Sequence, residues 1–358
     1  MTSLESENLP IGMGQRAPRR GSGNAVRRYI WNRRAFISSL AFFILMIAAF
    51  ATINPSIWTK PIVYSAVAIN LPTLSIIAVA LVFVVAAGEI DLSFGASVTF
   101  SGLVFAYAAL SGINPFLATL LAVLAGIGIG LVNGFLVAYV GLSSLIATLG
   151  MSFFWSGLAD ILSNGTGMPL NALQDSWLTT IMVGQIGRFP VQMLWAIGFA
   201  ILAGILFNRH KLGAYARYIG DNIAAAREMG VNIELTRLAV FGFVGLTAGV
   251  VGVMISLINV NYYPNAGNGL LLPVLAAVFV GGTPMLGGVG SIAGAFVGAM
   301  TISFISIGIL TSGFSGFYTN FLYGVVIVLS AVVHTVSGIQ SGGERRRWLA
   351  RILRREVS

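Results

Sequence analysis

The amino-acid sequence predicts an all-α integral membrane protein with about ten transmembrane helices, some of them broken, and with both termini in the cytoplasm. Of its 358 residues, 57% are hydrophobic and only 9% are charged, whereas a soluble domain keeps about a quarter of its residues charged. So little charge cannot cover a surface that faces water, and most of the exterior must therefore face lipid. The placement of the basic residues and the lengths of the apolar runs supply the rest of this prediction.

The basic residues gather in three clusters. Seven of the twenty lie between Arg16 and Arg34, five between Arg209 and Arg237, and six between Arg345 and Arg355. Because cytoplasmic loops carry the excess of Lys and Arg, all three clusters are expected to face the cytoplasm. The net charge of +9 is then a signal of topology, and no nucleic-acid partner is expected.

The apolar runs divide the chain into ten candidate crossings. We expect helices near residues 35–53, 62–87, 92–111, 115–139, 144–162, 191–208, 236–259, 268–282, 290–311 and 317–336. An even number of crossings places both termini inside, and it places the two remaining basic residues, Lys60 and Arg188, outside.

The domains follow from these helices. We expect a disordered basic cytoplasmic tail at 1–34, a transmembrane domain at 35–336 with a cytoplasmic loop at 209–235, and a second basic cytoplasmic tail at 337–358. Ala49-Phe50-Ala51 resembles a signal-peptidase site. The run before it is long for a signal, so an uncleaved anchor is expected.

Two segments depart from simple crossings. The apolar run at 270–280 has eleven residues, or about 17 Å of helix against a hydrocarbon core of about 30 Å, and is expected to be half of a broken helix. The polar stretch at 163–190 carries Trp177, Leu178, Ile181 and Met182. Their spacing predicts a short interfacial helix on the outer face.

Glycine is abundant, with 44 residues. Helices in lipid associate through close packing, and small residues permit that approach. Ladders at four-residue spacing predict two close helix contacts, and they consist of Gly126, Gly130 and Gly134, and of Gly290, Gly294 and Gly298.

The segment GEIDLSFG, residues 88–95, places two carboxylates in apolar sequence. A charge at membrane depth costs about 3 kcal/mol or more, so Glu89 and Asp91 are expected in a polar cavity or at an interface. Two interpretations stay open. Asp91 caps the next helix while glycines turn the chain, or the break lines or gates a solute path.

Further polar residues are candidates for the same path or gate. They are Asn70, Ser93 and Asn133, beside Glu89 and Asp91. Asn133 opens a second segment, NGFLVAYVGLSSLIATLG at 133–150. Its amide is expected to bond to a neighbouring helix or to touch a polar solute.

A third segment, LGAYARYIGDNIAAAREMGVNIELTRL at 212–238, is the longest predicted cytoplasmic loop. We expect a two-turn helix at 222–229 that is closed by Gly230. One side of this helix would carry Ile223, Ala225 and Ala226. Loops of this length are usually functional, which favours docking of this helix against a cytosolic partner. The alternative is a surface loop without a partner.

A fourth segment, VFVGGTPMLGGVGSIAGAFVGA at 278–299, has five glycines within ten residues around Pro284 and predicts a flexible hairpin. No GK[ST] follows and no strand precedes it, which argues against nucleotide binding. The chain has no cysteine, and its two histidines, His210 and His334, lie at predicted helix ends. No carboxylate pair joins them at ligand spacing, so neither a metal nor a cofactor is expected.

In this order and spacing, the four segments resemble the sugar-permease branch of ABC importers, the family that includes ribose, xylose and arabinose permeases. GEIDLSFG resembles the family's G-x-I-D-L-S-x-G segment, and NG…IATLG, GDNIAAAREMGV and GGTPMLGGVGSIAG match further family blocks. The matches span about residues 70–300. Ser144 stands where many members carry proline, and 267–278 lacks the acidic residues of ribose-type members, so the resemblance does not specify the solute.

The resemblance implies a multi-pass permease subunit of the bacterial inner (plasma) membrane that forms the path for a small sugar or sugar-like solute. Two permease chains, identical or paired, would form the path at their interface. A separate cytosolic ATPase would supply the energy and a periplasmic solute-binding protein would deliver the solute, so this chain would not be an enzyme. The loop containing Gly220, Asn222, Ala225, Glu228 and Gly230 would be the coupling helix that rests on the ATPase.

Three alternatives remain. The same scaffold could carry another solute, such as branched-chain amino acids, a sugar alcohol, inositol or a furanosyl signalling compound. A secondary, ion-coupled transporter usually places carboxylates well inside its helices, and Asp160, near a helix end, is the one further candidate. A membrane-embedded enzyme would need a His/carboxylate cluster or a nucleophile–base pair, and the sequence offers neither.

Overall fold

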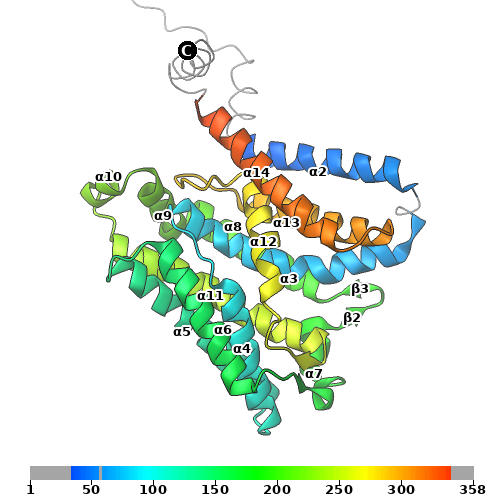
Figure 1. The fold of residues 1–358 in the computed structure, drawn as a ribbon. Helices are drawn as coiled ribbons and strands as arrows, with labels where there is room; N and C mark the ends of the chain where they lie inside the picture. Colours follow the sequence, from blue (N-terminus) through cyan, green and yellow to red (C-terminus); the bar gives the residue numbers. More distant parts are fainter. Residues whose placement is uncertain (1–33, 56–58, 340–358) are drawn as a thin grey trace, which may run out of the picture. The chain divides into compact units, whose positions relative to one another are not determined.

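The computed structural model describes residues 34–55 and 59–339, and this part of the chain is mainly helical (Figure 1). The helices are α2 (Arg34–Ile53), α3 (Pro61–Ala86), α4 (Phe94–Leu110), α5 (Pro115–Ala138), α6 (Ser144–Ser163), α7 (Trp177–Val183), α8 (Gln192–Arg209), α9 (Lys211–Asp221), α10 (Ile223–Glu228), α11 (Ile233–Ile258), α12 (Leu271–Val280), α13 (Ile292–Thr311) and α14 (Phe317–Ile339). Two 3₁₀ turns, η2 (Asn171–Leu173) and η3 (Asn268–Leu270), and four short strands complete the described chain. The strands are β1 (Met168–Pro169), β2 (Gln185–Ile186), β3 (Phe189–Pro190) and β4 (Asn261–Tyr262).

Each of the ten predicted apolar runs coincides with a helix in the described residues, and α7 lies where the interfacial helix was expected. Seven helices are long and apolar enough to cross a membrane, while α4, η3 with α12, and the apolar part of α14 are shorter. The all-helical membrane class is therefore confirmed, and ten crossings stays a prediction. The tails expected at 1–34 and 337–358 lie almost wholly outside the described residues.

α3 forms the core of the bundle. From Leu71 to Ala86 every one of its residues is buried, as expected for a helix that is apolar all round. It packs against α8, α11, α12 and α13, and its first turns, where Asn70 lies, are more exposed.

The first predicted glycine ladder and the last two glycines of the second lie at close helix contacts, whereas Gly290 precedes α13 and faces the side chains of Val82 and Phe207. A Cβ at Gly126 would overlap the carbonyl oxygen of Gly245, and one at Gly130 would overlap that of Phe241, so α5 and α11 touch backbone to backbone. Gly294 and Gly298 of α13 contact α12 in the same manner. These contacts are the small-residue packing that lipid requires in place of a hydrophobic driving force.

The connections between helices sort into two sets. One set, which we call the loop junction, consists of residues 86–93, 140–144, 210–232 and 281–291. The Gly288 amide donates to the Ala86 carbonyl oxygen over 2.9 Å, and a Cβ at Gly220 would overlap the same oxygen. The Ile90 amide donates to Ser144 Oγ over 3.1 Å.

The other set meets at the opposite end of the helices. The Tyr107 hydroxyl at the end of α4 donates to the Leu162 carbonyl oxygen at the end of α6, and β1 pairs with β4 in antiparallel register. The Asn54 amide after α2 lies 3.4 Å from the Thr311 carbonyl oxygen at the end of α13. Successive connections along the chain belong to the two sets in turn, so the helices between them run alternately in opposite directions. This agrees with the predicted crossings.

α12 spans only part of that distance. It has ten residues, about 15 Å of helix, and it is preceded by irregular chain that packs along α4. The Gly267 amide donates to Thr99 Oγ1 over 3.0 Å, and Gly267 touches the Gly95 carbonyl oxygen. Irregular backbone within a membrane protein is tolerated against protein in this way, and the arrangement matches the expected half of a broken helix.

Candidate functional site

The predicted break between α3 and α4 is present, and it begins at a glycine that ends α3. Gly88 has φ +78°, and its amide donates to the Val85 carbonyl oxygen while the Glu89 amide donates to that of Val84. This is a Schellman motif, in which glycine at the position after the cap ends the helix. Residues 89–93 are then non-helical until α4 begins at Phe94.

Asp91 does not cap α4 in the expected way. Ser93, two residues later, holds the N-cap position, and Asp91 Oδ1 accepts hydrogen bonds from the Ser93 amide at 2.7 Å and from Ser93 Oγ at 2.6 Å. Asp91 therefore stabilises the start of α4, as the capping prediction expected, but it lies two residues before the N-cap position. Asp91 is buried, and its partners make it a brace for the start of α4.

The break is tied to two further helices by polar side chains. Asn133 Nδ2 on α5 donates to Ser93 Oγ over 2.6 Å, which is the interhelical contact that the sequence favoured. On α6, Ser144 Oγ accepts from the Ile90 amide at 3.1 Å and Thr148 Oγ1 accepts from the Leu92 amide at 3.0 Å. The first two sequence segments therefore form one hydrogen-bonded unit around 88–93.

Glu89 has a cation partner that lies far away in the sequence. Its Oε1 is 2.6 Å from Arg237 Nη2 on α11, and the two side chains are 10% and 19% exposed. This pair neutralises a carboxylate that is otherwise costly to bury. No cation lies close to Glu89 in the sequence, and Arg237 was predicted only as part of a cytoplasmic basic cluster.

The predicted cytoplasmic loop is more ordered than expected. It contains α9 as well as α10, and a Cβ at Gly220 would overlap the Ala86 carbonyl oxygen at the end of α3. Asn222 Oδ1 caps α10 by accepting from the Ala225 amide at 3.0 Å. Gly230, with φ +77°, closes α10 in a second Schellman motif in which Val231 bonds back to Ala226.

The expected face of α10 was wrong. Ala226 is fully buried and packs with Ile219, Val231 and Ile233, whereas Ile223 is 45% exposed and Ala225 is exposed. Contacts with the rest of the protein decide which side of such a short helix is buried. The six residues of α10 alone do not predict those contacts. Of the residues assigned to coupling, Gly220, Asn222 and Gly230 shape the loop, while Ala225 and Glu228 lie on its surface.

The fourth segment brings its hairpin to the same place. Gly287 and Gly288 have positive φ, and Gly287 packs against the Gly88 backbone. Leu286 at the tip is 89% exposed. A cleft of about 370 Å³ opens between the hairpin and α10, and its lining includes Glu89, Gly220, Asn222, Arg237 and Leu286.

Asn70 is not part of this assembly. Its side chain is exposed and donates to the Ala66 carbonyl oxygen of its own helix at 2.8 Å. His210 Nδ1, for its part, accepts from the Leu212 amide at 3.2 Å and caps α9. Within 34–55 and 59–339, no group of three or more His, Cys, Asp or Glu residues is placed to hold a metal ion.

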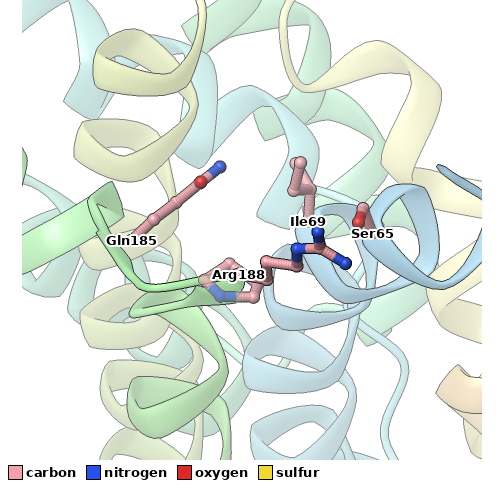
Figure 2. Close-up of a pocket in the computed structure, with 5 residues that line it drawn as sticks. Ser65, Ile69, Gln185 and Arg188 are labelled. Carbon is pink, nitrogen blue, oxygen red and sulfur yellow. The ribbon is translucent and has the colours of Figure 1, made fainter. Parts of the chain in front are cut away.

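A second, smaller hollow lies at the opposite end. Figure 2 shows Arg188 extending from the β2–β3 hairpin toward Ser65 and Ile69 on α3, with Gln185 beside the hollow. Its volume is about 100 Å³, below the range of about 300–1,000 Å³ that small-molecule sites occupy. It contributes a positive charge to this end and no enclosed binding chamber.

Arg237, Ser144 and Thr148 are the residues that sequence analysis missed in this role. Ser144 and Thr148 were visible as a polar pair four residues apart at the start of an apolar run, which places them on one helix face. Arg237 was counted only as part of a topology cluster. A buried carboxylate is costly unless it is paired. The position of Glu89 in apolar sequence is therefore the signal that predicts a cation partner elsewhere in the chain.

The apolar helices are those of a multi-pass membrane protein, and the comparison with known families gives its class. The family described as branched-chain amino acid transport system / permease component matches residues 63–331. The chain belongs to this family, whose members are permease components of transport systems, and it is a multi-pass protein of the inner membrane.

Curated relatives cover most of the chain. The ribose import permease of Escherichia coli K12 is 31% identical over 300 residues, which is 82% of this chain and 92% of the relative. The galactofuranose transporter permease of the same organism is 30% identical over 73% of this chain and 76% of the relative. The fructose import permease of Bifidobacterium longum is 29% identical over 76% and 78%. No solved structure matches the chain.

Proposed function

We propose that this chain forms the translocation path for a small sugar or sugar-like solute in an ABC importer. The observation that carries the proposal is the extent of its similarity to permeases named for ribose, galactofuranose and fructose. The family description names branched-chain amino acids, but these sugar-named relatives match over about three quarters of the chain or more. The chain works with a cytosolic ATPase, a periplasmic solute-binding protein and a second permease chain.

The proposed topology has ten crossings with both termini in the cytoplasm. The loop junction is then the cytoplasmic end, because the predicted cytoplasmic loop at 209–235 lies there and carries four basic residues, Arg209, Lys211, Arg217 and Arg227. The opposite end, with Arg188 and the α7 region, faces the periplasm. Two sets of connections that alternate along the chain support this arrangement.

The ATPase rests on α10 in this proposal. The exposed side of α10 carries small and apolar residues that the rest of the described chain leaves uncovered, among them Ile223, Ala224 and Ala225. The Asn222 cap and the Gly230 turn fix this short helix to α9 and α11. A rigid helix with an uncovered small-residue face suits a groove on a cytosolic partner.

The polar break at 88–93 is the proposed gate of the path. Ser93 and Asn133 supply neutral polar groups there, and Asn133 Oδ1 is buried without a hydrogen-bond partner in the described residues. Glu89 and Asp91 are both occupied by protein partners. Such a lining suits an uncharged hydroxylated solute better than an ion.

Replacement of Ala225 by Arg tests the coupling surface. Ala225→Arg is expected to leave the protein in the membrane and to abolish both ATPase retention and uptake, because a long charged side chain blocks close docking. Ala172→Arg, the same change at an exposed position in η2 at the opposite end, is expected to retain the ATPase. Normal uptake by Ala225→Arg would remove the coupling assignment.

The solute is tested through the binding protein that co-purifies with the chain. Its thermal stability is measured with ribose, fructose, galactofuranose and the branched-chain amino acids in turn. Stabilisation by one of the sugars is expected, since a bound ligand raises the melting temperature of the state that binds it. Stabilisation only by leucine, isoleucine or valine would contradict the sugar assignment.

A further inference from the structure

The ion pair between Glu89 and Arg237 joins the loop junction to the start of α11, and these two parts of the fold are far apart in the chain. Arg237 lies in the second turn of α11, and Glu89 lies directly after Gly88 at the end of α3. Their closest atoms are 2.6 Å apart, and both side chains are largely buried. Both residues also line the cleft that Ile223 and Ala224 of α10 line, so the pair lies beside the proposed docking surface.

On one side of the pair, α10 and the start of α11 form a single unit. Ala226 of α10 packs with Val231 and Ile233 of the following turn, and with Ile219 of α9. Asn232 caps α11 by accepting from the Leu235 amide at 2.8 Å. A displacement of α10 is therefore carried to Arg237 one turn further along α11.

On the other side, Glu89 belongs to the hydrogen-bonded break. The next residues are held by Ser144 and Thr148 on α6, and Ser93 is held by Asn133 on α5. The break contains the polar groups of the proposed gate. Movement of Glu89 is therefore movement of the segment on which that gate is built.

We propose that Arg237 and Glu89 are positioning residues that transmit displacement of the coupling helix α10 to the gate segment 88–93. The inference rests on the proposed coupling function and adds a route for it. Arg237 Nε is buried with no hydrogen-bond partner in the described residues, so the guanidinium is fixed to the junction through Glu89. Loss of either partner leaves a buried charge uncompensated and releases the link.

A second ion pair in the same loop provides the matched comparison. Arg227 Nη2 lies 3.1 Å from Glu234 Oε1, but these side chains are 66% and 38% exposed. Both residues belong to the unit formed by α10 and the start of α11. Without this exposed pair, α10 stays packed on the start of α11 through Ala226, Val231 and Ile233, so breaking it should not affect transmission.

Cysteine accessibility measures the transmission without knowledge of the solute, because the chain has no native cysteine. Ile90→Cys is placed in the gate segment, and inverted vesicles from the native host are treated with a membrane-impermeant maleimide. Labelling rates are compared without nucleotide and with ATP plus vanadate. ATPase retained by the chain is quantified on the same vesicles.

We expect ATP plus vanadate to change the labelling rate several-fold in the otherwise wild-type chain. Glu89→Gln and Arg237→Gln are expected to abolish this change while retaining the ATPase. The exchanged pair Glu89→Arg with Arg237→Glu is expected to restore part of it, which a loss of folding would not permit, and Arg227→Gln is expected to respond as wild type.

Three results would overturn the inference. The first is a normal nucleotide response in both Glu89→Gln and Arg237→Gln. The second is an otherwise wild-type chain that retains its ATPase while the labelling of Cys at position 90 ignores nucleotide, which contradicts this route and leaves the proposed function intact. Absence of any retained ATPase contradicts the proposed function itself, and the inference with it.

Discussion

The contact between α5 and α11 and the break between α3 and α4 hold helices together by opposite means. The first is apolar and close, with Gly126 and Gly130 against the carbonyl oxygens of Gly245 and Phe241. The second is polar, with Ser93, Ser144 and Thr148 bonded across three segments. Close packing of backbones permits little relative motion, whereas a few hydrogen bonds and an ion pair can exchange partners. From this difference we propose that α5 and α11 move as a rigid body and that 88–93 is the part suited to gating.

The largest effect is expected where the apolar contact is broken. Gly130→Leu places a side chain where the Phe241 carbonyl oxygen lies, so α5 and α11 must separate. We expect a loss of about 3 kcal/mol or more of folding free energy, at the upper end for overpacked cores. Thermal unfolding in detergent measures it. Gly128→Leu on the same helix, where nothing lies within 4 Å, is the control, and equal stability of the two variants would contradict the close contact.

A smaller effect is expected from the carboxylate that braces the break. Asp91→Ala removes the acceptor of two hydrogen bonds from Ser93, and bonds to charged groups contribute about 1.5–3 kcal/mol each. We expect a stability loss of about 2 kcal/mol, reduced transport, or both. Asp91→Asn keeps an acceptor oxygen and is expected to recover much of the stability. A variant normal in stability and uptake would show that the carboxylate is incidental.

Thr148→Val removes the hydroxyl that joins α6 to the break and that also donates to the Ser144 carbonyl oxygen of its own helix. The substitution keeps the shape of the side chain but leaves the Leu92 amide without its acceptor, at a cost of about 1–2 kcal/mol. Thr119→Val is the matched control, because Thr119 Oγ1 bonds only to the Pro115 carbonyl oxygen of its own helix. Chemical or thermal unfolding of the two variants side by side should show the larger loss for Thr148. Equal losses would mean that the bridge to α6 is not stabilising.

The smallest effect is expected for the exposed ion pair. Arg227→Gln should change stability by less than about 1 kcal/mol, because exposed pairs gain little in water and are screened by salt. Arg237→Gln, at the buried pair, should destabilise the protein more strongly. Melting temperatures at low and high salt distinguish them. A greater loss of stability for Arg227→Gln than for Arg237→Gln would contradict the expectation that the buried ion pair contributes more.

Most of the helices could be predicted because apolar runs of membrane length leave few alternatives. The ends of α10 were also predictable, since Asn222 and Gly230 have specific roles as cap and turn. The position of α9 was not foreseen. It contains Gly213, Arg217 and Gly220, and it becomes a packed helix through its contacts with α8, α11 and the end of α3.

The site was less predictable than the fold, and the reason is distance along the chain. Sequence analysis recognised Glu89, Asp91, Ser93 and Asn133 as polar residues in apolar surroundings, and all four lie together in the structure. Asn70 satisfied the same criterion but bonds to its own helix. The pairing of Glu89 with Arg237 depends on the packing of α3 beside α11, which residue patterns alone do not encode.

Co-purification is the strongest test of whether this chain is the permease of an ABC importer. The chain is tagged at its C-terminus and extracted from its native membrane in mild detergent, and its companions are identified by mass spectrometry. The account predicts recovery of a Walker-motif ATPase, together with uptake that requires ATP and withstands dissipation of ion gradients. A chain recovered intact and alone in several detergents, with uptake abolished by an ionophore, would contradict the account and indicate a secondary transporter.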